Sequence, residues 1–467
     1  MRRSLALLAL TAAILQGGCT LQNEVSITPV LILPGDVRPK GTSIIELEKT
    51  GDYGRALTYA DSVLGRERLR PAELLALGSS QLAAGRLEEA RRTLRSAVDL
   101  RLSFEHLGNV AWALSQTEYL ANNFEAAFDW AEMARANGVA VREWHVEYLR
   151  AMAGRPVYVL PSRHATIVDM EMGSPDIPRL TVAVNEEPRV TAVLDTGAVT
   201  SIISESFAKR TGVEPITTFQ GTFLGLLGEP ISVKFGIMDR LVIGDLEINH
   251  VPVAIMADDK LQFFVYNKEP FRMELLLGTN LLKEFRVELD FQREILTLQP
   301  LEEVDRRPSP EQNLFMVGFR PLVQAAIDRK GWYLFVVDTG SEVTFLNEER
   351  IEDTPVRRST RYHGARLQGL GGSQMSGEKV SNVEIAVDAW GGRFKNIPLY
   401  RSDQSAAYGI LGQNYLKNFR VVIDFGTMRL DLFRSRDDFQ RSTIPDRPMI
   451  DEPVEKERPR PVDPERM

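Results

Sequence analysis

The sequence predicts a multidomain protein in which an α-helical repeat domain precedes two related all-β lobes. Three observations carry this prediction. Ala, Leu, Glu and Arg at helical spacing dominate residues 43–155. Strand-like runs of Val, Ile, Leu, Thr and Phe, broken by Gly, Pro and Asp, fill residues 163–434. Within that second region, one motif and its surroundings occur twice, and the length of 467 residues agrees with several domains.

Composition excludes some classes of function. The formal net charge is -8, and no basic run with interleaved aromatic residues is present, which argues against a nucleic-acid partner. Cys19 is the only cysteine, so the chain forms no internal disulfide and must be stabilised by packing. The five histidines lie far apart without the spacing of metal ligands, and we expect no metal and no cofactor; they are His106, His145, His164, His250 and His363.

The N-terminus has the pattern of an export signal. A basic start at Arg2 and Arg3 is followed by an apolar run and by small residues, and we expect residues 1–18 to be a signal peptide. Cys19 follows directly, which resembles a bacterial lipoprotein signal and implies lipidation of that cysteine. A plain secretory signal with a chance cysteine is the alternative. We therefore expect a cell-envelope, periplasmic protein, anchored by lipid with the outer membrane favoured, and a tether over residues 19–42.

A repeat is visible in the helical region. The segment Gly51–Ala56 aligns with Gly85–Ala90, 34 residues later, and Asn122–Ala127 follows 37 residues after that. This period and the small residues resemble tetratricopeptide repeats, whose helix pairs stack into concave binding surfaces. The resemblance implies a protein partner, or positioning of a substrate, by these helices. An unrelated helical bundle is the alternative.

The β-rich region carries its motif once in each half. Residues 192–203 run from an apolar strand through Asp195, Thr196, Gly197 and Ala198 into a second apolar strand. Residues 334–346 do the same through Asp338, Thr339, Gly340 and Ser341. One such Asp-Thr-Gly is readily explained as a turn between strands, with the Asp side chain capping it. Two, in similar surroundings, are far less readily explained in that way.

A second repeated segment extends the duplication. Residues 276–291 align with residues 410–425, and ten of the sixteen pairs are identical. The β-rich region is therefore a tandem duplication. We place the first lobe at residues 163–301, a charged linker at 302–312 and the second lobe at 313–434. Residues 435–467 are rich in Pro, Arg, Asp and Glu, and we expect a disordered tail.

Together these motifs resemble the retropepsin and pepsin class of aspartic peptidases. The resemblance implies two retropepsin-like closed β-barrel lobes, each lending one Asp to an endopeptidase site, with Asp195 and Asp338 as catalytic residues. It further implies that the Thr196 and Thr339 side chains form hydrogen bonds across the lobe interface. The segments that end in Gly278 and Gly412 should pack beneath the Asp loops.

The chemistry suits these residue types. Two carboxylates that share one proton supply both the base that activates water and the acid that protonates the leaving amine. Gly197 and Gly340 allow a tight turn that brings backbone N–H groups near the carboxylates. Ser341 can donate a hydrogen bond to Asp338, whereas Ala198 cannot serve Asp195. Our hypothesis from this asymmetry is that Asp338 is the more readily ionised partner.

The family also has mobile flaps above the dyad. Glycines that permit hinge motion are the candidates, namely Gly225 and Gly228 in the first lobe and Gly369, Gly371 and Gly372 in the second. Ordinary hairpin turns use the same residues. Two alternatives to a shared active site remain open. One is a non-catalytic envelope lipoprotein that binds through its helical repeats. In the other, each lobe pairs with the same lobe of a second chain.

Overall fold

The computed structural model describes residues 14–16, 25–30, 43–63, 68–100, 103–225, 229–263, 270–357, 365–369, 372–376, 378–402 and 406–434. Residues up to Leu432 belong to one compact unit, and a second unit begins at Phe433. Cys19, most of the expected signal peptide and the expected tail at 435–467 lie outside the described residues. In the part of the chain that is described, no helix is long and apolar enough to span a membrane.

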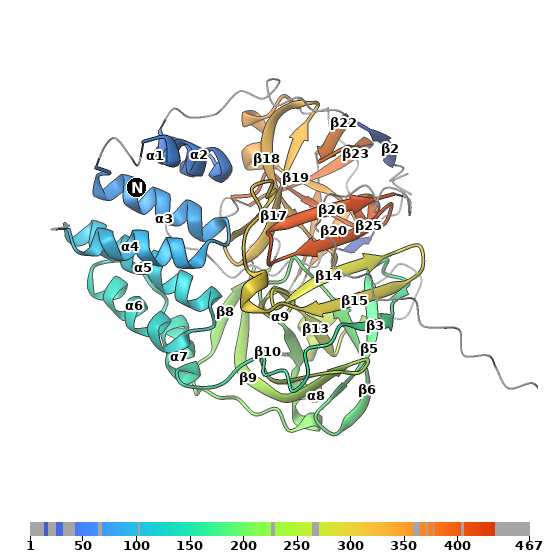
Figure 1. The fold of residues 1–467 in the computed structure, drawn as a ribbon. Helices are drawn as coiled ribbons and strands as arrows, with labels where there is room; N and C mark the ends of the chain where they lie inside the picture. Colours follow the sequence, from blue (N-terminus) through green and yellow to red (C-terminus); the bar gives the residue numbers. More distant parts are fainter. Residues whose placement is uncertain are drawn as a thin grey trace, which may run out of the picture. The chain divides into compact units, whose positions relative to one another are not determined.

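The N-terminal part is helical, as the sequence predicts. The helices are α1 (Ile44–Lys49), α2 (Tyr53–Val63), α3 (Pro71–Ala83), α4 (Leu87–Val98), α5 (Phe104–Leu120), α6 (Phe124–Ala136) and α7 (Glu143–Met152) (Figure 1). The turns after α1, α3 and α5 use Gly51, Gly85 and Asn122, with φ of 78°, 70° and 60°. These three residues head the repeats found in the sequence, and glycine or asparagine tolerates the left-handed conformation that each turn requires. That these helices are tetratricopeptide repeats stays a prediction.

The first lobe is a closed barrel. Its elements are β3 (Thr166–Asp169), β4 (Glu171–Met172), β5 (Pro178–Val184), β6 (Glu187–Leu194), β7 (Ile202–Ser204), α8 (Glu205–Thr211), β8 (Gly221–Leu224), β9 (Pro230–Ile243), β10 (Leu246–Met256), β11 (Gln262–Phe263), β12 (Phe271–Arg272), β13 (Leu275–Leu277), α9 (Thr279–Leu282), β14 (Phe285–Asp290) and β15 (Ile295–Pro300). Strands β5, β6, β13, β7, β10 and β9 follow one another in the sheet, and β9 pairs again with β5. This second pairing closes the ring around the apolar core of the lobe.

The second lobe repeats this topology. Its elements are β16 (Leu314–Val317), β17 (Arg320–Ile327), β18 (Lys330–Val337), β19 (Phe345–Asn347), β20 (Ala365–Gly369), β21 (Gly372–Ser376), β22 (Lys379–Val387), β23 (Trp390–Tyr400), β24 (Gly409–Leu411), α10 (Gln413–Leu416), β25 (Arg420–Asp424) and β26 (Arg429–Phe433). The ring runs β17, β18, β24, β19, β23 and β22, and β22 returns to β17. Equivalent strands thus close both barrels, as the duplication predicts.

Two short strands lie before the helices. Strand β2 (Val25–Pro29) pairs antiparallel with β23, so part of the stretch expected to be only a tether extends the sheet of the second lobe. Its alternation of β-branched residues with polar ones suits the edge of a sheet. Strand β1 (Ile14–Gln16), in the stretch expected to be signal peptide, pairs with β20.

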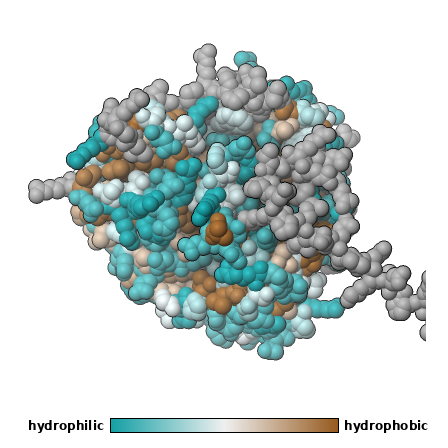
Figure 2. Space-filling model, in the orientation of Figure 1, coloured by the Kyte–Doolittle hydropathy of each residue, from teal (hydrophilic) through white to brown (hydrophobic). Residues whose placement is uncertain are grey.

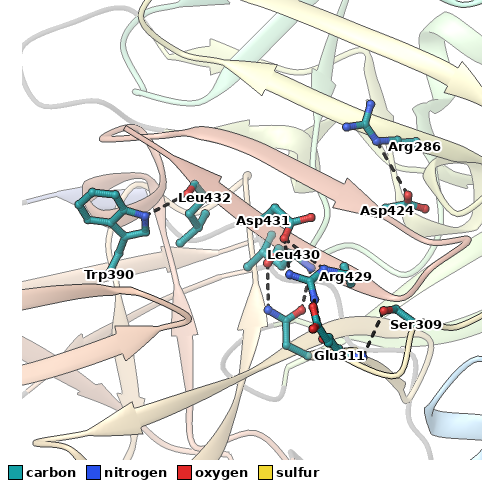
Figure 3. Close-up of polar contacts among 10 residues, drawn as sticks. Arg286, Ser309, Glu311, Trp390, Asp424, Arg429, Leu430, Asp431 and Leu432 are labelled. Carbon is teal, nitrogen blue, oxygen red and sulfur yellow. Dashed lines mark hydrogen bonds and ion pairs between the residues drawn. The ribbon is translucent and has the colours of Figure 1, made fainter. Parts of the chain in front are cut away.

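One sheet joins the two lobes. Its order is β26-β25-β14-β15-β3, and the pairing of β14 with β25 crosses from one lobe to the other. Arg286 of β14 lies 3.9 Å from the carboxylate of Asp424 on β25, and Asn313 bonds the backbone of Leu430 (Figure 3). These two strands come from the second repeated segment, so the duplicated sequence builds the sheet that fastens its own two copies together.

The helical domain packs on both lobes. The Tyr53 ring lies 5.6 Å from Phe315 of the second lobe, and the Trp144 ring stacks 5.7 Å from Phe235 of the first. Between them, Asn122 bonds both Lys283 and Glu284. The face in Figure 2 is mostly hydrophilic, with separate hydrophobic patches, because the large apolar side chains are spent on these interfaces and on the barrel cores.

Candidate active site

The two Asp loops begin where equivalent strands end. Asp195 follows β6 and Asp338 follows β18. Each loop rests on the apolar strand of the second repeated segment: the backbone N–H of Asp195 donates to Leu277 O at 3.0 Å, and that of Asp338 donates to Leu411 O at 3.1 Å. The predicted packing of these segments beneath the loops is confirmed.

Glycine is required where the backbones meet. A Cβ on Gly278 would lie 2.7 Å from the Thr200 carbonyl carbon, and one on Gly412 would lie 2.8 Å from Ser341 O. A Cβ on Gly340 would lie 2.5 Å from Oδ2 of Asp195, in the other lobe. Separations this short exclude any side chain, so the loops approach each other only because these residues lack one.

The two threonines tie the loops together reciprocally. The N–H of Thr196 donates to Oγ1 of Thr339 at 3.0 Å, and the N–H of Thr339 donates to Oγ1 of Thr196 at 3.1 Å. Each hydroxyl in turn donates to a backbone carbonyl of the other lobe, Thr196 to Val337 at 2.6 Å and Thr339 to Leu194 at 2.7 Å. All these groups are buried, so the network places both Asp loops with little freedom. The cross-lobe bonds implied by the resemblance are present.

Asp195 and Asp338 are brought together and are both fully buried. Oδ1 of Asp195 accepts the N–H groups of Gly197 at 2.8 Å and Ala198 at 3.0 Å, and Oδ1 of Asp338 accepts that of Gly340 at 2.9 Å. Burial and then the neighbouring Asp338 carboxylate raise the pKa of Asp195 well above its usual range, against the lowering effect of its two N–H donors. Two carboxyl groups so placed titrate as a pair.

The hypothesis about Ser341 is wrong. Its hydroxyl donates to Val343 O at 2.8 Å and not to Asp338. The serine lies in a tight turn whose own carbonyl is the nearer acceptor, a local competition that short polar side chains often win. The expected asymmetry between the two carboxyls therefore loses its basis.

A second pair of side chains supports the loops, and the sequence reasoning missed it. Oγ1 of Thr279 donates to Thr196 O at 2.8 Å, and Nε2 of Gln413 donates to Thr339 O at 2.8 Å. Both follow the glycine of the second repeated segment directly, so their shared position in the internal alignment was the available signal. Their different residue types hid the common task.

The flap candidates lie at hairpins. Gly225 ends the first-lobe hairpin β8–β9, where its N–H donates to Glu229 O at 2.9 Å. Gly369 faces Gly372 across the hairpin β20–β21 of the second lobe. Gly228 and Gly371 lie outside the described residues. Trp144 of α7 contacts Phe223 and Phe235 of the first hairpin, with ring separations of 6.1 and 5.7 Å.

Arg320 was also missed. It begins β17, is 8% exposed, and lies close enough to Asp338 for their charges to interact. The signal was present in the internal alignment, because Arg320-Pro321 stands 18 residues before Asp338 and Ile177-Pro178 stands 18 residues before Asp195. One copy thus carries a cation where the other carries an apolar residue. Among the described residues, no group of His, Cys, Asp or Glu is arranged to hold a metal ion.

Comparison with known proteins agrees with this geometry. Residues 180–281, which contain the first Asp loop and its supporting strand, match the family model described as aspartyl protease. This match supports an aspartic protease fold. Among curated proteins, none matches the chain.

Three solved structures are distantly similar to the chain. A retropepsin-like aspartic protease from Rickettsia conorii is 19% identical over 31% of this chain and 96% of its own, with a TM-score of 0.22. Basic 7S globulin from soybean (10%; 59% and 96%; 0.35) and an aspartic proteinase from Irpex lacteus (11%; 59% and 99%; 0.32) span more of the chain. Likenesses this distant carry no argument about activity.

Proposed function

We propose that this protein is an aspartic endopeptidase in which Asp195 and Asp338 act as one catalytic dyad. The observation that carries the proposal is the burial of both carboxyl groups on two loops that the reciprocal Thr196–Thr339 network holds together. A structural turn needs no partner loop. A pair of buried carboxyls disfavours folding, because one of them must lose its charge or remain unstable, and such an arrangement is typical of a site kept for chemistry.

The dyad supplies a complete route for hydrolysis. With one proton shared, the ionised carboxyl removes a proton from water as the water oxygen attacks the peptide carbonyl carbon, and the protonated carboxyl donates to the carbonyl oxygen. The C–N bond then breaks as the amine nitrogen receives a proton, which leaves a free carboxyl and a free amine. Oδ2 of Asp195 accepts no hydrogen bond from the described residues, so it is available to water or substrate.

Cleavage of an unfolded protein between pH 3 and 8 tests this proposal. Wild type should cut, and Asp195→Asn and Asp338→Asn should each abolish cutting, because either substitution removes half of the dyad. Asp259→Asn, an exposed carboxylate of the first lobe, is the matched control and should cut normally. If one dyad variant still cuts, pairing of like lobes between two chains is the better explanation. A wild type that never cuts favours a binding protein.

We further propose that the protein is exported and anchored through a lipidated Cys19. The support is the sequence pattern alone, since these residues lie outside the described ones. Metabolic labelling with a radioactive fatty acid should mark the wild type and leave Cys19→Ser unlabelled. Label on both would place the modification elsewhere.

A protein partner for the helical domain also stays a proposal. The Tyr53 and Trp144 contacts commit part of its surface to the lobes. A partner would therefore bind the remaining surface, or would compete for these contacts and change activity. Comparing cleavage by the full chain with and without added envelope extract distinguishes these effects.

A further inference from the structure

Arg320 lies directly across the sheet from the second Asp. The ladder between β17 and β18 pairs Leu322 with Val336, and the same register continued by two residues puts Arg320 opposite Asp338. Residues opposite each other on neighbouring strands point to the same face of the sheet. The guanidinium therefore belongs to the surroundings of the dyad and not to the outer wall of the barrel.

The positive charge of Arg320 is poorly compensated. The side chain is more than nine-tenths buried, its Nε has no hydrogen-bond partner, and no ion pair with it is found among the described residues. Burial lowers its pKa, and the nearby groups that oppose this lowering are Tyr400 and Asp338. A dyad that shares one proton carries a single negative charge, which its own backbone donors already stabilise. A buried guanidinium normally has a carboxylate or phosphate bound to it.

The equivalent position of the first lobe provides a comparison within the same molecule. The β5–β6 ladder pairs Arg179 with Val193, and its continuation puts Ile177 opposite Asp195. Ile177 is 1% exposed. An apolar residue thus satisfies the architecture at this position, so the architecture does not explain the arginine in the second lobe. Its use lies in what binds beside Asp338.

We propose that Arg320 determines specificity by binding a carboxylate of the substrate, so that the cleft selects peptides with an acidic side chain close to the scissile bond. This inference rests on the proposed peptidase function. Arg320 occurs in one lobe only, so the preference applies to one side of the scissile bond. The terminal guanidinium nitrogens suit a bidentate contact with a carboxylate, which is stronger and more directional than a contact with a neutral amide.

Peptide binding to a silent enzyme tests the inference separately from cleavage. Asp195→Asn removes the dyad from the lobe that lacks Arg320 and keeps Asp338 intact. Fluorescent peptides of one length carry a single Glu at successive positions, each matched by a peptide with Gln there. At one or two positions the Glu peptide should bind about tenfold more tightly than its Gln partner, the usual gain from one charge-assisted contact.

Further substitutions in the same silent enzyme identify the residue responsible. Arg320→Gln should abolish the preference for Glu, and Arg320→Lys should keep part of it. Lys330→Gln, which removes an exposed cation at the far end of the same hairpin, should leave the preference unchanged. Thermal unfolding of each variant checks that the fold is kept.

Each outcome decides the matter. A preference for Glu that disappears only with Arg320 supports the inference, even if the wild type cuts nothing and the peptidase proposal fails. The inference is overturned if Glu and Gln peptides bind alike at every position, if neither binds, or if the preference survives in Arg320→Gln. Equal weakening of both peptides by Arg320→Gln would show a residue that only positions Asp338.

Discussion

Thr196 and Thr339 exchange backbone-to-hydroxyl hydrogen bonds of 3.0 and 3.1 Å, so each lobe completes the active-site loop of the other. Neither loop satisfies these buried N–H groups by itself. The two lobes therefore fold as partners, and this dependence makes the interface testable.

Replacing Thr196 by Val keeps the shape of the side chain and removes its hydroxyl. The Thr339 N–H and the Val337 carbonyl then lose their partner in a buried site. We expect the free energy of unfolding to fall by about 3 kcal/mol, the cost of two unsatisfied buried groups. Urea unfolding measures this change. Thr181→Val on the exposed face of β5 is the control, and equal losses in the two variants would contradict the role of the network.

The raised pKa of Asp195 makes stability depend on pH. The folded protein holds this proton more tightly than the unfolded chain, so the contribution is full below the ordinary pKa of 3.8 and is lost as pH rises through the folded value. Every tenfold gain in proton affinity corresponds to about 1.4 kcal/mol of this contribution. Asp195→Asn does not titrate and should be more stable than wild type at pH 7 but not at pH 3. Thermal unfolding at both pH values measures this, and an Asn variant less stable at pH 7 would refute it.

His145 gives the helical domain the opposite pH response. Burial among Trp112, Trp144 and Tyr119 lowers its pKa from 6.5 to about 4. The folded state therefore favours neutral imidazole, and its contribution to stability, full above pH 6.5, is lost as pH falls towards 4. The loss should approach roughly 3 kcal/mol. His145→Gln should lack this dependence, and the exposed His106→Gln should keep it, as urea unfolding at pH 7 and 4.5 will show.

Gly340 is required by its contact with the opposite carboxyl. A methyl group at this position would lie 2.5 Å from Oδ2 of Asp195 and would push the two loops apart. Because a displacement of about 1 Å can lower a rate roughly a hundredfold, we expect Gly340→Ala to lose at least that much cleavage activity. Gly54→Ala has only an ordinary 3.9 Å contact with Phe315 and should keep full activity. Equal activity in both variants would mean that the loops can adapt.

Trp144 should restrain the first hairpin. Its ring packs on Phe223 and Phe235, which lie on the two strands of β8–β9. Trp144→Ala removes this contact, and we expect faster amide hydrogen exchange in residues 221–235. Trp130→Ala, a substitution in α6 within the helical core, is the control. Unchanged exchange in that hairpin would show that α7 does not restrain it.

Much of the site was predictable because it depends on local patterns. The repeated Asp-Thr-Gly and the repeated segment ending in Gly278 and Gly412 place identical chemistry on equivalent strands. Glycine at such positions reflects a steric need of the backbone that appears directly as a residue type. The same holds for Gly51, Gly85 and Asn122, whose turns mark the helical repeats.

Other features required the tertiary structure. The Ser341 hydroxyl had two acceptors within reach of its sequence position, and only the conformation of the turn decided for Val343. Strand β2 depended on an available sheet edge at β23, far along the chain, which no local pattern of Val25–Pro29 reveals.

The sequence by itself thus determined the duplication, the two Asp loops and the helical segment, because each rests on periodicity or on residues adjacent in the chain. Only the tertiary structure decided that Arg320 lies opposite Asp338 and that α7 packs on the β8–β9 hairpin. These relationships arise between residues distant in sequence, where packing and burial of charge select among arrangements that local preferences leave equal.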